Sequence, residues 1–100
     1  MELHSHYEAI REAGAEVVAL AVASVEAVEG WCQRAGINYP MLADATHQVA
    51  EGYGVYNLLG DGLAAPAVFI VDTDRRIVWS RVGQNAGDLV GVQTILEYLP

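Results

Sequence analysis

Two long apolar runs interrupt the mixed pattern of the chain and predict its principal strands. Residues Glu16–Ala23 and Ala67–Val71 are almost continuously apolar, which is typical of strands buried on both faces of a sheet. Tyr39–Ala43 is a shorter run of the same kind. Arg76–Val82 resumes the apolar pattern after the polar residues Asp72–Arg75, so the last two strands form a hairpin with a tight turn.

Apolar residues three or four positions apart predict helices on either side of these strands. The predicted helices cover Glu2–Ala13, Val25–Ala35, Ala45–Tyr53 and Asp88–Leu99. Ser24 and Asp44 stand before two of these helices and are good N-cap residues. Val49 and Tyr53 are expected to point inward from the third helix, and the fourth helix has four apolar residues in register, Leu89, Val92, Leu96 and Leu99.

The resulting element order, α, β, α, β, α, β, β, α, predicts an α/β sandwich. Residues 16–43 form a right-handed βαβ unit with parallel strands, whereas the hairpin is antiparallel. Pro66 opens the hairpin, where its missing N–H costs no ladder hydrogen bond and where a cis peptide bond could occur. One hundred residues without repeats or linkers predict a single domain, 1–100.

The charge balance excludes two classes of partner. The net charge is −8, the chain has five arginines and no lysine, and both nucleic acid and an anionic membrane surface require a positive field. No apolar run approaches the roughly 20 residues of a membrane-spanning helix, and the first residues lack the layout of a signal peptide. We therefore expect a cytoplasmic protein by default.

Candidate chemistry is sparse. Cys32 is the only cysteine, so no internal disulfide can form, and thiol chemistry would need a second molecule or end at a sulfenic acid. His4 and His6 are two positions apart and point to different sides of a helix, and His47 has no companion ligand nearby in sequence. We expect no metal and no cofactor.

Four stretches together resemble the peroxiredoxin family, also described as alkyl hydroperoxide reductase/thiol-specific antioxidant, of the thioredoxin-like superfamily. They are Ala-Gly-Ala-Glu-Val-Val-Ala-Leu-Ala-Val-Ala-Ser-Val-Glu-Ala-Val (13–28), Gly-Ile-Asn-Tyr-Pro-Met-Leu-Ala-Asp (36–44), Val-Ala-Glu-Gly-Tyr-Gly-Val (49–55) and Pro-Ala-Val-Phe-Ile-Val-Asp-Thr-Asp-Arg-Arg-Ile-Val-Trp (66–79). The resemblance implies a thioredoxin-like sheet of about four strands flanked by helices, and it implies thiol-dependent reduction of hydroperoxides as the family activity.

The resemblance does not extend to the family's reactive thiol. Peroxiredoxins carry the peroxide-attacking cysteine in a Pro-x-x-x-Thr-x-x-Cys motif, and none of the three prolines here begins one. Cys32 is a weak candidate for a resolving-type thiol, and we favour the alternative that it is a small buried apolar residue. Pro66 is expected to line the site of the ancestral thiol. The family commonly has glycine where Arg75 stands, so that turn is either strained or of another type.

In the family's sheet a central strand lies between the strands corresponding to residues 16–23 and 67–71. Without it, both strands have unpaired edges that must be satisfied in another way. The two strands pair directly, a second copy fills the gap, or the chain is trimmed from a longer protein. We expect a homodimer that covers these edges, with a thioredoxin-type protein as a possible reductant. The alternative function is a non-catalytic thioredoxin-fold module for dimerisation or binding.

Overall fold

The computed structural model describes residues 3–99, with the side chain of His4 excepted, and contains the eight predicted elements in the predicted order. They are α1 (Leu3–Glu12), β1 (Ala19–Ala21), α2 (Val25–Ala35), β2 (Met41–Ala43), α3 (Gln48–Gly52), β3 (Ala67–Val71), β4 (Ile77–Val82) and α4 (Val92–Tyr98). The predicted start of the first helix, Glu2, lies outside the described residues. The α/β architecture is therefore confirmed. The helices α3 and α4 and the strands β1 and β2 are shorter than predicted.

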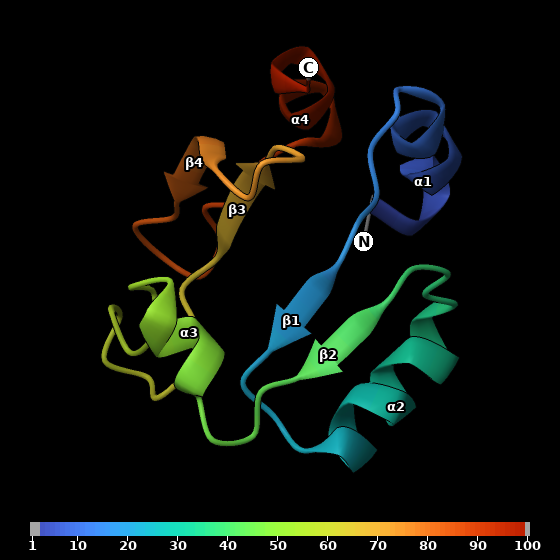
Figure 1. The fold of residues 1–100 in the computed structure, drawn as a ribbon. Coiled ribbons are helices and arrows are strands. Elements are labelled where there is room, and N and C mark those ends of the chain that lie inside the picture. The colour runs from blue at the N-terminus through green and yellow to red at the C-terminus, as the bar shows by residue number, and fades with distance from the viewer. Residues whose placement is uncertain (1–2, 100) are drawn as a thin grey trace.

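The strands form two separate sheets instead of one. β1 pairs with β2 in parallel through the crossover helix α2, and β3 pairs with β4 in antiparallel fashion with an irregularity between Ile70 and Val71. β1 and β3 run in opposite directions and stand apart, with α1 and α4 together at one end of the molecule (Figure 1). Direct pairing of β1 with β3 is thus not the arrangement that this chain adopts.

The local signals around α2 produce the structure that they predict. The Ser24 side chain accepts a hydrogen bond from the Ala27 backbone N–H at 3.2 Å, as an N-cap residue does. Gly36 follows the last turn with φ of 65°, a left-handed conformation that glycine adopts without steric cost. α2 then packs against β2, which completes the βαβ unit.

Asp44 caps α3, although the helix begins later in the sequence than predicted. The helix begins at Gln48 instead of Ala45, and the Asp44 carboxylate accepts hydrogen bonds from the N–H groups of Val49 (3.3 Å) and Ala50 (2.9 Å). His47 occupies the N-cap position in the left-handed region, at φ of 54°, and makes no side-chain cap. The buried carboxylate of Asp44 therefore fixes how the chain leaves β2 and enters α3.

The core is built mainly from helices and loops, because the strands are less buried than their composition predicts. The buried apolar residues are Tyr7, Ile10, Val28, Tyr39, Ala50, Val55, Ala65, Ile70, Val92 and Ile95. Ile70 is the only buried residue within a strand. The expectation that β1 and β3 are buried on both faces is wrong, because no strand lies between them in the described part of the chain.

The two inward residues predicted for the third helix are exposed, whereas the face predicted for the fourth helix is exposed at Leu89 but buried at Val92. Val49 and Tyr53 are each about half exposed, since the side toward which they point is open. Leu89 is 69% exposed, because α4 begins only at Val92 and Leu89 lies in the loop that precedes it.

The hairpin turn contains the strained alternative predicted for it. Arg75 has φ of 67°, in the left-handed region where a side chain is disfavoured. Asp72 compensates by accepting hydrogen bonds at 2.9 Å from the N–H groups of Asp74 and Arg76. The peptide bond before Pro66 is trans, as are all peptide bonds in the described range.

A tyrosine–carboxylate hydrogen bond ties α1 to the segment that leads into β1, and it should make stability depend on pH. The Tyr7 hydroxyl donates to Glu16, which lowers the pKa of Glu16 below its usual 4.5 and raises the pKa of Tyr7 above 10.0. The Glu16 contribution is present above pH 4.5 and is lost as the pH falls through its lowered pKa. The Tyr7 contribution is present below pH 10.0 and is lost as the pH rises through its raised pKa.

We therefore expect Glu16→Gln to make stability less dependent on pH on the acid side. Urea unfolding midpoints measured between about pH 3 and pH 7 would show a shallower decline for the variant. Glu12→Gln, a change to an exposed carboxylate at the end of α1, is the control and should leave the decline as it is. Equal declines in wild type and Glu16→Gln would show that this hydrogen bond contributes nothing.

Candidate functional site

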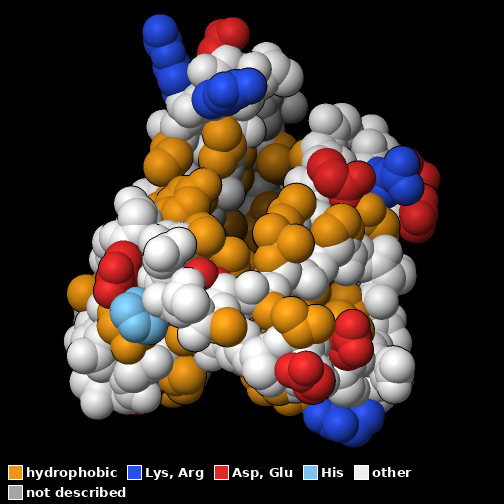
Figure 2. Space-filling view, turned by 60° about the horizontal axis from the view of Figure 1, so that its bottom comes forward, with side chains coloured by type: hydrophobic (Ala, Val, Ile, Leu, Met, Phe, Trp, Pro, Cys, Tyr) orange, Lys and Arg blue, Asp and Glu red, His pale blue; other side chains and the backbone are white. Residues whose placement is uncertain are grey.

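An open groove of about 1500 Å³ separates the two sheets. We call it the inter-sheet groove and define it by the strand segments that face each other across it, residues 17–22 and 66–72, with walls from α3, α4 and the loop before α4. Figure 2 shows apolar side chains gathered around this hollow. The groove is consequently a largely apolar surface that the fold leaves open.

The backbone along both edges of the groove has unused hydrogen-bonding capacity. The Ala19 N–H donates to Pro40 O, and Ala21 O accepts from the Asp44 N–H, so these two residues face β2. Because successive strand residues point their backbone groups to opposite sides, Val18, Leu20 and Val22 face the groove. No described strand pairs with them there.

The same reasoning applies to β3. Pro66 O accepts from the Gly83 N–H at 2.6 Å, which places the backbone groups of residues 66, 68 and 70 toward β4. Ala67, Phe69 and Val71 therefore direct theirs toward the groove. The two edges that border the groove are thus both free to take a partner strand.

Pro66, the residue predicted to line an ancestral thiol site, lies in the groove lining at the start of β3. Its position depends on Gly83, since a Cβ at Gly83 would lie 2.5 Å from Asp88 O and 3.1 Å from Pro66 O. Asp88 in turn accepts hydrogen bonds from Arg81 at 2.6 Å and from the Gln84 N–H at 3.0 Å. The loop after β4 is thereby held against the end of β3.

Cys32, the other predicted site residue, lies elsewhere. It is half-buried near the C-terminal end of α2, and its thiol donates to the Met41 thioether with the sulfur atoms 3.9 Å apart. Met41 lines the groove, but Cys32 does not. The structure therefore does not bring Cys32 and Pro66 into one site. Burial raises the pKa of the neighbouring Tyr39 hydroxyl, and the Cys32 side chain adds to the rise.

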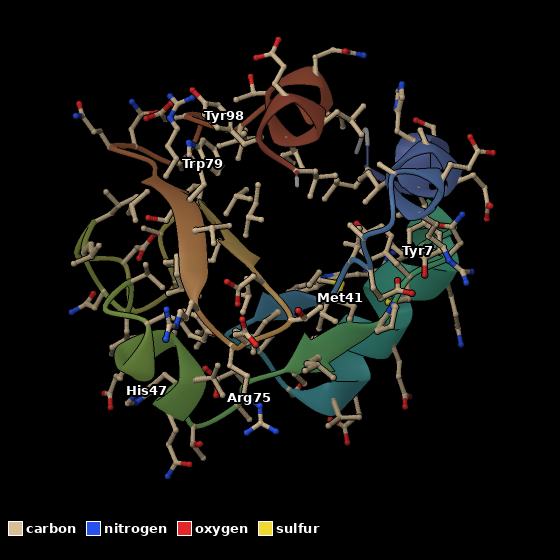
Figure 3. The ribbon with its side chains drawn as sticks, turned by 45° about the horizontal axis from the view of Figure 1, so that its top comes forward. Tyr7, Met41, His47, Arg75, Trp79 and Tyr98 are labelled. Carbon is tan, nitrogen blue, oxygen red and sulfur yellow. The ribbon has the colours of Figure 1, made fainter. Side chains whose placement is uncertain are left out.

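The contacts of His47 with Tyr56 and Glu51 were not predicted from the sequence. The His47 ring stacks on Tyr56 with 4.0 Å between ring centres, and His47 Nδ1 lies 2.8 Å from Glu51 Oε1. Figure 3 shows His47 at α3. It also shows Trp79 of β4 beside Tyr98 of α4, and these two rings stack with 4.7 Å between their centres. The four-residue spacing of His47 and Glu51 was the only available signal. Among the described residues no group of three or more potential ligands could hold a metal ion.

Taken together, a parallel βαβ unit, an antiparallel hairpin opened by a proline and flanking helices define the thioredoxin-like architecture of peroxiredoxins. The chain belongs to the AhpC/TSA family, whose model matches residues 1–80. No curated protein sequence matches the chain. None of the described helices is both long and apolar enough to cross a membrane.

Solved structures show the same fold. AhpC of Enterococcus faecalis is 27% identical with a TM-score of 0.86, over 97% of this chain and 59% of that one. AhpC of Mycobacterium tuberculosis is 22% identical with a TM-score of 0.86, over 98% and 56%. The reduced 2-Cys peroxiredoxin of Plasmodium vivax is 22% identical with a TM-score of 0.83, over 95% and 51%. The chain thus spans between half and three fifths of the length of these relatives.

Proposed function

We propose that the chain is part of a peroxiredoxin-type antioxidant system that reduces hydroperoxides with thiols, and that the peroxide-attacking cysteine lies outside these 100 residues. The match of the family model to residues 1–80 supports this most directly. The sequence contains no Pro-x-x-x-Thr-x-x-Cys motif, and its single cysteine faces Met41 instead of the groove. A cytoplasmic location remains part of the proposal.

The chemistry of this class is a two-electron transfer. A cysteine thiolate attacks one peroxide oxygen, the O–O bond breaks, and the products are a sulfenic acid and an alkoxide that takes up a proton. A second thiol then displaces water from the sulfenic acid to form a disulfide. A dithiol reductant of the thioredoxin type would restore both thiols by exchange. Pro66 would line the site in which the first step occurs.

Cys32 is not expected to take part in this cycle. Its thiol is turned toward the interior between α2 and β2, where it contacts a thioether that offers only a weak interaction. We therefore expect Cys32→Ser to leave hydroperoxide consumption with a dithiol reductant unchanged from the level of the wild-type chain. The measurement is loss of the reductant's thiols on addition of hydrogen peroxide, with a reaction lacking protein as the blank.

Three further observations would decide the matter. Activity in the wild-type chain that Cys32→Ser abolishes would make Cys32 the reacting thiol. A Pro-x-x-x-Thr-x-x-Cys motif encoded in frame upstream of Met1 would supply the proposed cysteine. A start codon shown to operate at Met1, together with an inactive chain, would favour the non-catalytic module instead.

We also propose a homodimer in which a second copy covers an open strand edge. A two-fold interface must be self-complementary, and a concave groove cannot fill another groove of the same shape. The outer edge of β4 suits such an interface better, because it is unpaired and exposes Ile77, Val78 and Val82. The expected dimer interface therefore lies at β4, away from the inner edges considered first.

A further inference from the structure

We propose that the bond between Asp61 and Gly62 is a site of spontaneous isoaspartate formation, which makes the surrounding loop a substrate for a carboxyl methyltransferase that acts on isoaspartate. The loop, residues 57–63, lies between α3 and β3. Asp61 is the only aspartate of the chain that is followed by glycine. The inference concerns this loop alone and does not depend on the proposed thiol chemistry.

The reaction is a ring closure by the backbone itself. The Gly62 nitrogen attacks the side-chain carbon Cγ of Asp61, a C–N bond forms, and the hydroxyl of the protonated carboxyl group leaves as water with the proton from nitrogen. Water then opens the resulting succinimide. Opening at Cγ restores aspartate, whereas opening at the main-chain carbonyl breaks the original peptide bond and leaves the chain linked through Cγ. One water leaves and one enters, so no further reactant is required.

Three features of the loop favour this ring closure. Asp61 and Gly62 are both exposed, so water reaches the nitrogen and the ring. A Cβ at Gly62 would have no neighbour within 4 Å, and glycine itself places no side chain in the path of the attack. The Asp61 carboxylate accepts a hydrogen bond from the Leu63 N–H at 3.0 Å, so it is folded back toward the backbone that must attack it.

The other aspartates lack this combination, and each is followed by a residue with a side chain. Asp44 is buried and its carboxylate accepts hydrogen bonds from α3. Asp72 and Asp88 each accept two hydrogen bonds. Asp74 is exposed, but the residue after it is arginine. These four residues are therefore internal controls within the same molecule.

Asn57 restrains the reacting nitrogen. Its side-chain Oδ1 accepts a hydrogen bond from the Gly62 N–H at 2.8 Å, and its own N–H donates to Leu63 O at 2.8 Å. The first of these bonds must break before the nitrogen can attack, so Asn57 slows the ring closure. Isoaspartate adds one carbon to the backbone at this point, so it would separate Gly62 from Asn57 and displace Leu63, which lines the inter-sheet groove.

The test is prolonged incubation of the folded 100-residue chain at neutral pH, followed by labelling with purified isoaspartyl methyltransferase and S-adenosylmethionine that carries a radioactive methyl group. We expect label to accumulate with time, and we expect peptide mapping to locate it in the peptide that contains Asp61. Peptides that contain the four other aspartates should carry none. Circular dichroism before and after incubation checks that the chain stays folded.

Matched variants test the assignment. Asp61→Glu keeps the charge but requires a larger ring, so it should remove the label. Gly62→Ala should slow labelling by about tenfold, because its methyl group crowds the nitrogen. Asn57→Gly suits the φ of 57° at this position and removes the side-chain acceptor, so it should speed labelling. Asn85→Gly is its control, since Asn85 accepts a similar hydrogen bond from the Gly87 N–H in another loop, and labelling should keep its wild-type rate.

Absence of label in the incubated wild-type chain would overturn the proposal. Label that persists in Asp61→Glu, or that is spread equally over the aspartates, would also overturn it. Label that arises only in urea would show that the folded loop prevents ring closure. Equal rates for Asn57→Gly and the wild type would contradict the restraining role of Asn57.

Discussion

Ile10→Ala is expected to lower the free energy of unfolding by about 3 kcal/mol, within the range of roughly 2–5 kcal/mol for truncation of a buried aliphatic side chain. Ile10 is 2% exposed and is the largest fully buried side chain of the described residues. It lies on α1, so its truncation leaves a cavity beneath this helix. Urea unfolding followed by circular dichroism would measure the change.

Leu58→Ala is the matched control for this prediction. Leu58 is 54% exposed and does not line the groove, so its truncation should alter the free energy of unfolding by less than about 0.5 kcal/mol. Equal losses for the two variants would show that α1 is not anchored by Ile10. A domain of this size has about 5–15 kcal/mol of stability in total, so the expected loss is large enough to be unambiguous.

Asp44→Ala is expected to lower the free energy of unfolding by about 2 kcal/mol, because it leaves the buried N–H of Ala50 and the part-buried N–H of Val49 without an acceptor. The carboxylate of Asp44 accepts from Val49 and Ala50 and is itself buried. Asp44→Asn keeps one side-chain acceptor and should cost less. Chemical denaturation again gives the measurement. Faster amide exchange at Ala50 in the variant would report loss of the hydrogen bond directly.

Asp74→Ala serves as the control for the cap. Asp74 is an exposed carboxylate in the hairpin turn, and only its backbone N–H is engaged, by Asp72. Its truncation should leave stability almost unchanged. A loss as large as that of Asp44→Ala would mean that net negative charge, and not the cap, determines the effect.

Short-range signals predicted the local structure well. Ser24 and Gly36 bound α2 as their residue types require, and the apolar run after Pro66 forms β3. Burial was predicted poorly, because it depends on what lies beside an element and not on the element's own residues. Val18 and Val71 belong to strands that read as fully buried, yet both face the open groove.

The candidate site could be predicted only in part. Pro66 lies in the groove lining, and its place beside a reactive thiol stays a prediction drawn from the resemblance to peroxiredoxins. The contact of Cys32 with Met41 and the stacking of His47 on Tyr56 depend on how distant segments meet, and no local pattern encodes them. The sequence predicted that Asp44 caps the third helix. It did not predict that the Asp44 carboxylate accepts a hydrogen bond from the N–H of Ala50, inside the first turn of α3.

The division of the strands into two sheets has a consequence for cooperativity. Each half is held by its own ladder, β1 with β2 and β3 with β4, while α1 and α4 join the halves at one end. Such halves can open as separate units, with different protection factors for their amide hydrogens.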